Sequence, residues 1–270
     1  MTTTSGPLSG LLILTPTLRG LAYMTEVTLD SLVAAGATKL RMNGNSCVAM
    51  HRSQIAGKAE TILAEHPELT TVLWLDGDMV ATVETVAELG RLTNQIAESR
   101  PLPDELAEQY ELDKPQGEQT ARLWRRTMGP AISGAYVKRN APKEFALAAC
   151  VPHEPPLTID RPRGDGELER LELPAIVSGM GCLCQTREAF LSHVAEAPVM
   201  APNTSRQFPA VCASGPGRAA DGAVAWGSED WTFCSWEWQR GRGVYLARHC
   251  PFGHIGESVF WPDSTTLFVD

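Results

Sequence analysis

The stretch Thr70-Thr71-Val72-Leu73-Trp74-Leu75-Asp76-Gly77-Asp78 is the one around which the rest of the chain is organised. Its four consecutive apolar residues, Val72 to Leu75, do not alternate with polar ones. This pattern predicts a strand that is buried on both faces, as in a parallel sheet. The carboxylates begin where that strand must leave the core. We therefore expect Asp76 and Asp78 at the edge of a central sheet.

Two carboxylates so close together repel each other, and a divalent cation would relieve that repulsion. In a strand, residues i and i+2 point to the same side, so we expect both acids to face one ion. Gly77 would let a ligand approach the backbone. Mg²⁺ and Mn²⁺ suit such a site, because both take oxygen ligands and leave positions for water and phosphate. A solvated Asp-Gly-Asp turn after a core strand is the structural alternative.

The composition is that of a globular protein. The chain has 270 residues, 43% of them hydrophobic, which is enough for one large α/β domain or two small ones. No apolar run approaches the roughly 20 residues that span a bilayer, and residues 1–10 lack a signal-peptide pattern, so we expect a cytoplasmic protein. The seven cysteines include no Cys-x-x-Cys pair, which favours reduced thiols over zinc binding.

The net charge of -9 argues against a surface that binds polyanions in general. A local basic groove remains possible, and its alternative is a set of solvated loop charges. The residues that could form the groove are Arg122, Arg125, Arg126, Arg161 and Arg163.

The first 97 residues alternate between predicted strands and helices. Strands are expected at 11–14, 38–42 and 72–75, and helices at 21–35, 47–65 and 83–97, with the turn 43–46 capping the second helix. This order predicts a parallel sheet with right-handed crossovers, whose ligands bind outside the carboxyl ends of the strands. The residues expected at or near that edge are Thr15, Thr17, Arg19, Asn43, Asn45, Arg52, Asp76 and Asp78.

The second half of the chain is less regular. The polar stretch 98–119 predicts an excursion from the sheet. Strands are expected at 131–137, 175–183 and 243–247, a hairpin over 158–173, and helices at 187–195 and 228–240. The Pro- and Gly-rich region 197–227 predicts a mobile loop over the site. The turn 250–256 is flanked by glycines and holds His254.

Two features of this half carry charged groups that could act on a ligand. Lys138 and Arg139 follow a predicted strand and could meet diphosphate oxygens, or could simply be basic residues at a strand end. Glu229 and Asp230 open a predicted helix, where acids are favoured by the helix dipole, so capping alone is the alternative.

Taken together, these pieces resemble a GT-A glycosyltransferase. The resemblance rests on their order, which covers most of the chain, and it is greatest to bacterial and phage-type members that carry Ala-Arg-Asn before the metal strand, where this chain has Met50-His51-Arg52-Ser53. The pieces are Thr15-Pro16-Thr17, Arg52, Asp76-Gly77-Asp78, Ser133 to Lys138, Gly179-Met180-Gly181, Ser228-Glu229-Asp230 and Gly253-His254-Ile255-Gly256.

The resemblance implies a single domain over 1–270 with an α/β fold, in which a Rossmann-like mixed sheet, mostly parallel, is flanked by helices. Residues 1–96 would form the nucleotide-binding half and 130–270 the acceptor-side half, with insertions or loops at 98–128 and 197–227. The implied reaction is metal-dependent transfer of a sugar from a UDP- or GDP-sugar to an acceptor hydroxyl. The acceptor could be a modified DNA base, as in phage-type relatives, a glycan, a lipid-linked or protein acceptor, or a small molecule.

The resemblance also implies roles for individual residues. Asp76, Asp78 and His254 would hold Mn²⁺ or Mg²⁺. Asp230, or otherwise Glu229, would take the acceptor's proton in an inverting displacement; in a retaining enzyme the same acids would orient the acceptor. The donor would be contacted by Thr15, Thr17, Arg19, Asn45, Arg52, Asp76, Lys138, Gly179 and Gly181.

Two other functions fit parts of the sequence. Asp76-Gly77-Asp78-Met79-Val80 matches the Asp-x-Asp-x-[Thr/Val] opening of haloacid-dehalogenase-type phosphatases, whose first Asp is a nucleophile. That motif normally lies on the first strand, and this chain has no convincing later Lys and paired-acid motif. The remaining alternative is a nucleotide-sugar-binding module that does not turn over its ligand.

Overall fold

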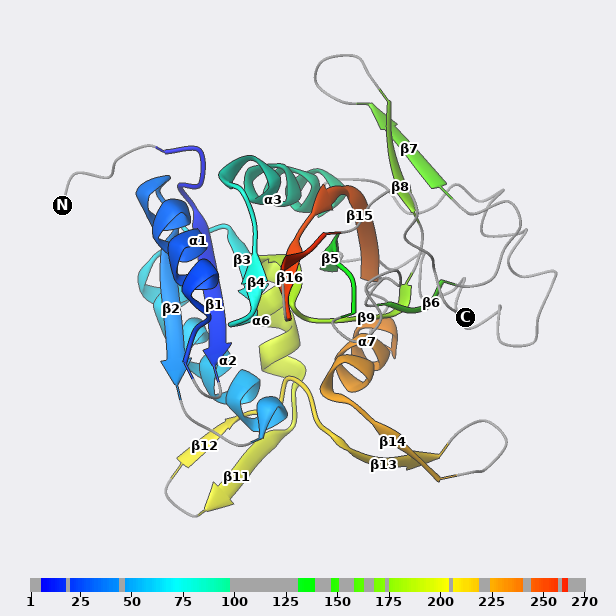
Figure 1. Ribbon diagram of the computed structural model, residues 1–270. Coiled ribbons are helices and arrows are strands. Elements are labelled where there is room, and N and C mark those ends of the chain that lie inside the picture. Colours follow the sequence, from blue (N-terminus) through cyan, green and yellow to red (C-terminus); the bar gives the residue numbers. More distant parts are fainter. Residues whose placement is uncertain are drawn as a thin grey trace.

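The fold is built on an eight-stranded mixed sheet (Figure 1). The computed structural model describes residues 6–17, 20–43, 47–97, 131–138, 147–150, 158–162, 168–172, 175–203, 206–218, 224–239, 244–256 and 259–261. In order across the sheet the strands are β2 (Thr38–Asn43), β1 (Leu11–Thr17), β3 (Thr71–Leu75), β10 (Cys182–Thr186), β5 (Ala131–Ala135), β15 (Val244–Pro251), β8 (Leu168–Glu172) and β7 (Thr158–Pro162).

Most strands of this sheet run in one direction. β2, β1 and β3 are mutually parallel, β10 is antiparallel to both β3 and β5, β15 is parallel to β5, and β8 is antiparallel to its neighbours β15 and β7. Only β10 and β8 therefore oppose the other strands of the sheet. The expected α/β architecture with a mixed, mostly parallel sheet is confirmed.

Helices cover both faces of the sheet. α1 (Tyr23–Ala34) and α3 (Val83–Ala97) pack on one face, and α2 (Val48–Glu65), α6 (Arg187–Glu196) and α7 (Glu229–Gln239) pack on the other. On β3, Leu73 and Leu75 belong to the first core, while Val72 and Trp74 belong to the second. The unbroken apolar run is thus explained, because a strand between two helical layers buries every side chain.

The order of the strands in the sheet reverses at β1. β1 has β2 on one side and β3 on the other, and α1 and α2 lie on opposite faces of the sheet. In open α/β sheets, ligands bind outside the carboxyl ends of the strands at such a switch point. That position is the end of β1 and of β3, where Thr17 and Asp76 lie.

A small three-stranded sheet brings the C-terminal part of the chain to the same edge. β4 (Met79–Val80) pairs with β16 (Gly253–Ile255), which pairs with β17 (Val259–Phe260). His254 lies opposite Met79 in this register, and Ile255 N–H donates to the Asp78 carbonyl at 2.8 Å. His254 is therefore in a strand, and the expectation of a turn is wrong, because the backbone of β4 offers it a partner.

Two further sequence expectations are wrong in the second half. The predicted strand 175–183 is two strands, β9 (Ala175–Ser178) and β10, separated by the turn around Met180, and β9 pairs with β6 (Leu147–Cys150) outside the main sheet. The region 197–227 contains two hairpins, β11 (Val199–Asn203) with β12 (Arg206–Pro209) and β13 (Gly215–Arg218) with β14 (Val224–Gly227). It is not an unstructured loop, because β12 packs on α2, where Pro209 lies against Gly57.

The other helices and strands agree with the sequence within a few residues at their ends. α3 and the β7–β8 hairpin form as expected. The N-cap residue of α2 is Cys47, and its side chain makes no capping hydrogen bond. Asn43, from the turn that was expected to cap this helix, is the last residue of β2, and 44–46 lie outside the described residues. The excursion 98–119 and Arg139 also lie outside them. Cys47, Cys182, Cys184, Cys212, Cys234 and Cys250 are free thiols, and all of these six except Cys47 are buried. In the part of the chain that is described, no helix is both long and apolar enough to cross a membrane.

Candidate functional site

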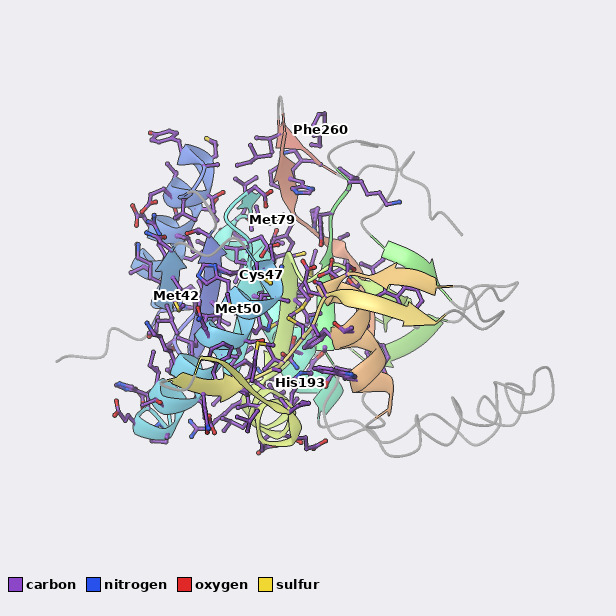
Figure 2. All side chains as sticks on the ribbon, turned by 90° about the horizontal axis from the view of Figure 1, so that it is seen from below. Met42, Cys47, Met50, Met79, His193 and Phe260 are labelled. Carbon is purple, nitrogen blue, oxygen red and sulfur yellow. The ribbon has the colours of Figure 1, made fainter. Side chains whose placement is uncertain are left out.

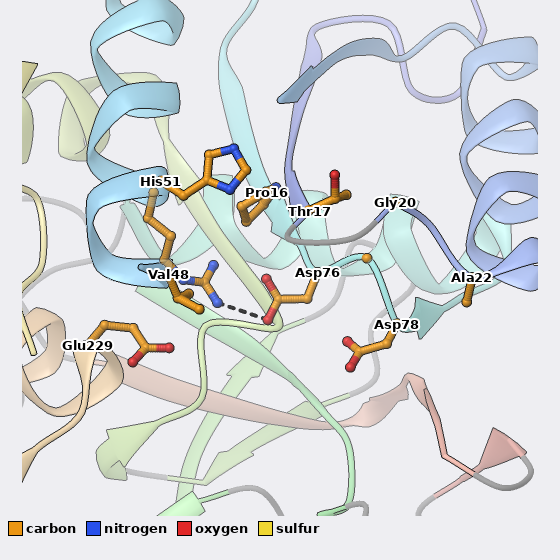
Figure 3. Close-up of a pocket in the computed structure, with 11 residues that line it drawn as sticks. Pro16, Thr17, Gly20, Ala22, Val48, His51, Asp76, Asp78 and Glu229 are labelled. Carbon is orange, nitrogen blue, oxygen red and sulfur yellow. Dashed lines mark hydrogen bonds and ion pairs between the residues drawn. The ribbon is translucent and has the colours of Figure 1, made fainter. Parts of the chain in front are cut away.

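A cavity of about 570 Å³ opens at the carboxyl ends of β1 and β3 (Figure 3). Its walls come from the end of β1, the segment leading into α1, the first turns of α2, the Asp76-Gly77-Asp78 turn and the start of α7. The lining residues are Pro16, Thr17, Gly20, Ala22, Val48, His51, Arg52, Asp76, Gly77, Asp78 and Glu229. Asp76, Asp78, Thr17 and Arg52 thus lie together, as the sequence predicted.

Arg52 and Asp76 form an ion pair in the wall of this cavity. Arg52 Nη2 donates to Asp76 Oδ2 at 2.8 Å, and the side chain of Arg52 is 2% exposed whereas that of Asp76 is 28% exposed. The Arg52 guanidinium also lies over the Trp74 ring, 5.8 Å from its centroid. Its other two nitrogens, Nε and Nη1, are buried without a hydrogen-bond partner among the described residues.

Charges around this pair shift both pKa values. Burial opposes the charged form of Arg52, but Asp76, Asp230 and Glu229 outweigh it and raise the pKa of Arg52. For Asp76, burial raises the pKa, Arg52 lowers it, and the nearby Asp78 carboxylate raises it again, with a net upward shift. The expected repulsion between Asp76 and Asp78 is therefore present, and Arg52 only partly relieves it.

Asp78 pairs with His254 on the far side of the turn. His254 Nε2 lies 3.5 Å from Asp78 Oδ2, and His254 Nδ1 lies 2.7 Å from the Val137 carbonyl. Because a carbonyl can only accept, Nδ1 donates its proton to Val137, and Nε2 is the ring nitrogen that faces Asp78. A backbone carbonyl that fixes the tautomer in this way is typical of metal-binding histidines.

The Asp76-Gly77-Asp78 segment is a turn and not a continuation of β3. Met79 N–H donates to the Asp76 carbonyl at 3.1 Å, so the expectation that strand alternation aims both acids at one ion is wrong. Gly77 is needed for packing, since a Cβ there would meet Thr17 Cγ2 at 3.1 Å and Leu21 Cδ2 at 3.3 Å. The atoms that come close to Gly77 on this side are therefore those of Thr17 and Leu21, and not those of a ligand.

A metal ion would find two ligands of suitable chemistry here. The Asp78 carboxylate and the His254 imidazole fit Mn²⁺ or Mg²⁺, with water and phosphate oxygens completing the coordination. Across the residues that the structure describes, no three His, Cys, Asp or Glu side chains are grouped closely enough to hold an ion. Asp76 of the expected set is hydrogen-bonded to Arg52 instead.

The acids of α7 approach the cavity from the opposite side. Glu229 lines it, whereas Asp230 accepts a hydrogen bond from Met180 N–H at 3.0 Å. Burial raises the pKa of Asp230 to about 6, against the effect of Arg52 and with a further contribution from Glu229. Asp230 is therefore ionised at neutral pH but holds a proton more readily than an ordinary aspartate, as a general base requires.

Tyr136 connects these two sides, a role that was not predicted although the residue lies in the predicted strand 131–137. Gly181 N–H donates to the Tyr136 hydroxyl at 3.2 Å, and the Gly181 carbonyl accepts Asp76 N–H at 3.0 Å. The Tyr136 ring packs edge-on against His254 at 5.5 Å. A Cβ on Gly181 would lie 3.0 Å from the Tyr136 hydroxyl, so this glycine permits the contact.

The remaining predicted residues have separate positions. The Thr17 hydroxyl lies 2.6 Å from Asn43 Oδ1, and Thr15 is buried with its hydroxyl unpaired among the described residues. Lys138 follows Val137, whose carbonyl holds His254, and Gly179 lies in the connection that precedes Met180. Arg19 and Asn45 lie outside the described residues. His51, on the cavity wall, was not predicted as a site residue.

Comparisons with known proteins provide no family for the chain. No protein-family model matches it, and no curated protein matches it. Among solved structures, the chain is similar to the crystal structure of A197 from STIV, with 12% sequence identity and a TM-score of 0.43, over 96% of this chain and 97% of the other.

Proposed function

We propose that this protein is a metal-dependent glycosyltransferase that moves a sugar from a nucleoside diphosphate donor to an acceptor hydroxyl. The observation that carries the proposal is the cavity at the switch point, which is lined by the Arg52–Asp76 pair, Asp78 and Glu229. His254 lies against Asp78, and Asp230 is the neighbour of Glu229 at the start of α7. Among the described lining residues the cavity has one cation, Arg52, and three acids, Asp76, Asp78 and Glu229. A diphosphate needs a divalent cation to settle there, because the carboxylates otherwise repel it.

Each residue has a role that its surroundings support. Asp78 and His254 would hold Mn²⁺ or Mg²⁺, which when bound acts as a Lewis acid for the departing diphosphate. The unpaired nitrogens of Arg52 can donate to donor oxygens. Asp230 would accept the proton of the attacking hydroxyl, while Met180 N–H keeps its carboxylate oriented. Glu229 would hold the acceptor, and the product would have inverted configuration.

The phosphatase is the weaker alternative. Asp76, its nucleophile, follows the third strand in the chain and is hydrogen-bonded to a buried arginine. A nucleophilic carboxylate must instead be free to attack phosphorus. A DNA acceptor has no support near the cavity either. Arg161 lies on edge strand β7, with β10, β5, β15 and β8 between it and β3, and the other four arginines of the suggested basic groove lie outside the described residues.

The test is a screen of UDP- and GDP-sugars with Mn²⁺, read by thermal unfolding, because a donor that binds the native fold raises its melting temperature. We expect one donor to raise it in a Mn²⁺-dependent way, and to be consumed when acceptors are added. Release of phosphate from phosphomonoesters would favour the phosphatase, and a shift without turnover would favour the binding module. The absence of any shift would contradict the proposal.

A further inference from the structure

His51 is a buried histidine in the cavity wall that the proposed chemistry does not use. It lies in the first turns of α2, next to Arg52, and its side chain is 1% exposed. Neither ring nitrogen has a partner at hydrogen-bonding geometry within the described part of the chain, although the Met42 carbonyl lies close enough to act on the ring. An unpaired buried polar group costs about 1–3 kcal/mol, so its presence in a cavity wall calls for a partner that arrives with the ligand.

The surroundings of His51 define the hydrogen-bonding character of its ring. Burial, followed by the neighbouring Arg52, lowers the pKa of His51, and the Met42 carbonyl opposes this. The ring is therefore neutral at pH 7, with one N–H and one lone pair. Since the Met42 carbonyl only accepts, it favours the N–H on the nitrogen nearer to it. The other nitrogen is then an acceptor, and it needs a donor group.

A phosphate cannot fill that requirement, because its oxygens also accept. The N–H or NH₂ groups of a nucleobase and the hydroxyls of a ribose can. The position agrees with this distinction, since Figure 3 shows the His51 imidazole above Asp76 and well apart from Asp78, and Asp76 is the partner of the Arg52 guanidinium that suits a phosphate. Pro16 and Val48 also supply apolar surface to the wall, against which a flat base can pack.

We propose that His51 binds the nucleoside part of the donor by accepting a hydrogen bond from its base or ribose. This inference rests on the proposed function and assigns a separate part of the cavity to each half of the nucleoside diphosphate. His51 contacts the nucleoside, and Arg52 with the Asp78–His254 pair contacts the phosphates. Specificity for the nucleotide then depends on a residue that plays no part in the transfer step.

The test is calorimetric titration of UDP, GDP, ADP, CDP and inorganic pyrophosphate, each with Mg²⁺, into the full chain. We expect His51→Leu to weaken the preferred nucleoside diphosphate about tenfold and to leave pyrophosphate unchanged. His51→Gln, which keeps an acceptor, should recover part of the affinity. His66→Leu, at an exposed histidine that pairs with Glu68 beyond the other end of α2, is the matched control and should change neither.

The 2′-deoxy form of the preferred nucleotide separates the two sources of the hydrogen bond. If His51→Leu removes discrimination against the deoxy form, the contact is to ribose; if it removes discrimination among bases, the contact is to the base. Equal affinity of wild type and His51→Leu for every nucleotide, or an equal loss for pyrophosphate, would overturn the inference alone. Failure of the wild type to bind any of these probes would overturn both the inference and the proposed function.

Discussion

Two side-chain pairs of this protein, His193–Glu237 and Arg52–Asp76, differ in how completely their polar atoms are hydrogen-bonded. In the pair between α6 and α7, His193 Nδ1 lies 2.5 Å from Glu237 Oε1, and His193 Nε2 donates to the Val211 carbonyl at 2.7 Å. In the cavity pair, Arg52 gives one nitrogen to Asp76 and leaves two unpaired among the described residues. Met79 directly follows the Asp-Gly-Asp turn, and Figure 2 shows His193 well away from Met79.

The difference separates structure from function. Where only the fold depends on a buried pair, as between His193 and Glu237, both ring nitrogens have a partner, because an unpaired group would cost stability for no gain. Arg52 and His51 keep unpaired nitrogens, and both line the cavity. Unsatisfied buried groups gathered at one place indicate where a ligand is expected.

The largest expected effect is on the cavity side, in Asp78→Asn. An amide is a poor ligand for Mn²⁺ or Mg²⁺, so sugar transfer should fall by at least about a thousandfold, or 4 kcal/mol. The melting temperature should stay within about two degrees, because Asp78 lies in an open turn with its side chain 30% exposed. The control is Asp30→Asn, at an exposed acid that pairs with Lys39 on the surface. Transfer retained in Asp78→Asn would remove the metal role.

On the core side, Glu237→Ala should lower the free energy of unfolding by about 3 kcal/mol, measured by urea denaturation. Removing one partner of a buried pair leaves the other uncompensated. A variant with both His193→Leu and Glu237→Met should recover most of the loss. A single-variant effect below about 1 kcal/mol would show that this pair is not structural.

Arg52→Met tests the comparison directly, because it removes the side chain whose Nε and Nη1 have no hydrogen-bond partner among the described residues. We expect unfolding stability to change by less than about 1 kcal/mol, since two unpaired nitrogens disappear and Asp76 still has access to water. Affinity for the nucleoside diphosphate with Mg²⁺ should fall about thirtyfold, about 2 kcal/mol. If the loss of stability equals that of Glu237→Ala while the affinity is unchanged, the cavity pair is structural as well.

The sequence predicted the first 97 residues closely, because each element there is local. A strand that is buried on both faces, such as Val72 to Leu75, and a helix that stops at Gly36 depend on nearby residues. It also placed Arg52, Asp76 and Asp78 near one edge, since parallel strands share that edge.

What the sequence could not predict depends on pairing between distant segments. His254 reaches Asp78 only through the register of β16 on β4, and Tyr136 reaches His254 only because Gly181 leaves room. The two hairpins within 197–227 are short and rich in Pro and Gly, so their strand character comes from pairing and from packing, of β12 on α2 and of β14 on α7.

Tyr136→Phe should have a smaller effect than the preceding variants. It keeps the ring against His254 but leaves Gly181 N–H without its partner, so we expect unfolding stability to fall by about 1.5 kcal/mol. Mn²⁺ affinity, measured by titration, should change less than twofold, because the ring still positions His254. Tyr136→Leu, which removes the ring contact, should weaken Mn²⁺ binding about fivefold. Equal Mn²⁺ affinity in both variants would show that the ring does not position His254.

A further effect, confined to one pH range, is the pH dependence that Asp230 gives to stability. Its pKa in the folded protein is about 6, above the value of an unfolded aspartate, so burial of its charge is unfavourable. Below about pH 4 the Asp230 carboxyl is protonated in both the folded and the unfolded protein, so it does not lower the free energy of unfolding. As the pH rises through 6 the buried carboxyl becomes charged, and the free energy of unfolding falls. Asp230→Asn should therefore be about 1–2 kcal/mol more stable than wild type at pH 8 and equal to it at pH 3.5. The amide can still accept Met180 N–H, so a variant that is less stable than wild type at pH 8 would show that the Asp230 charge favours the fold.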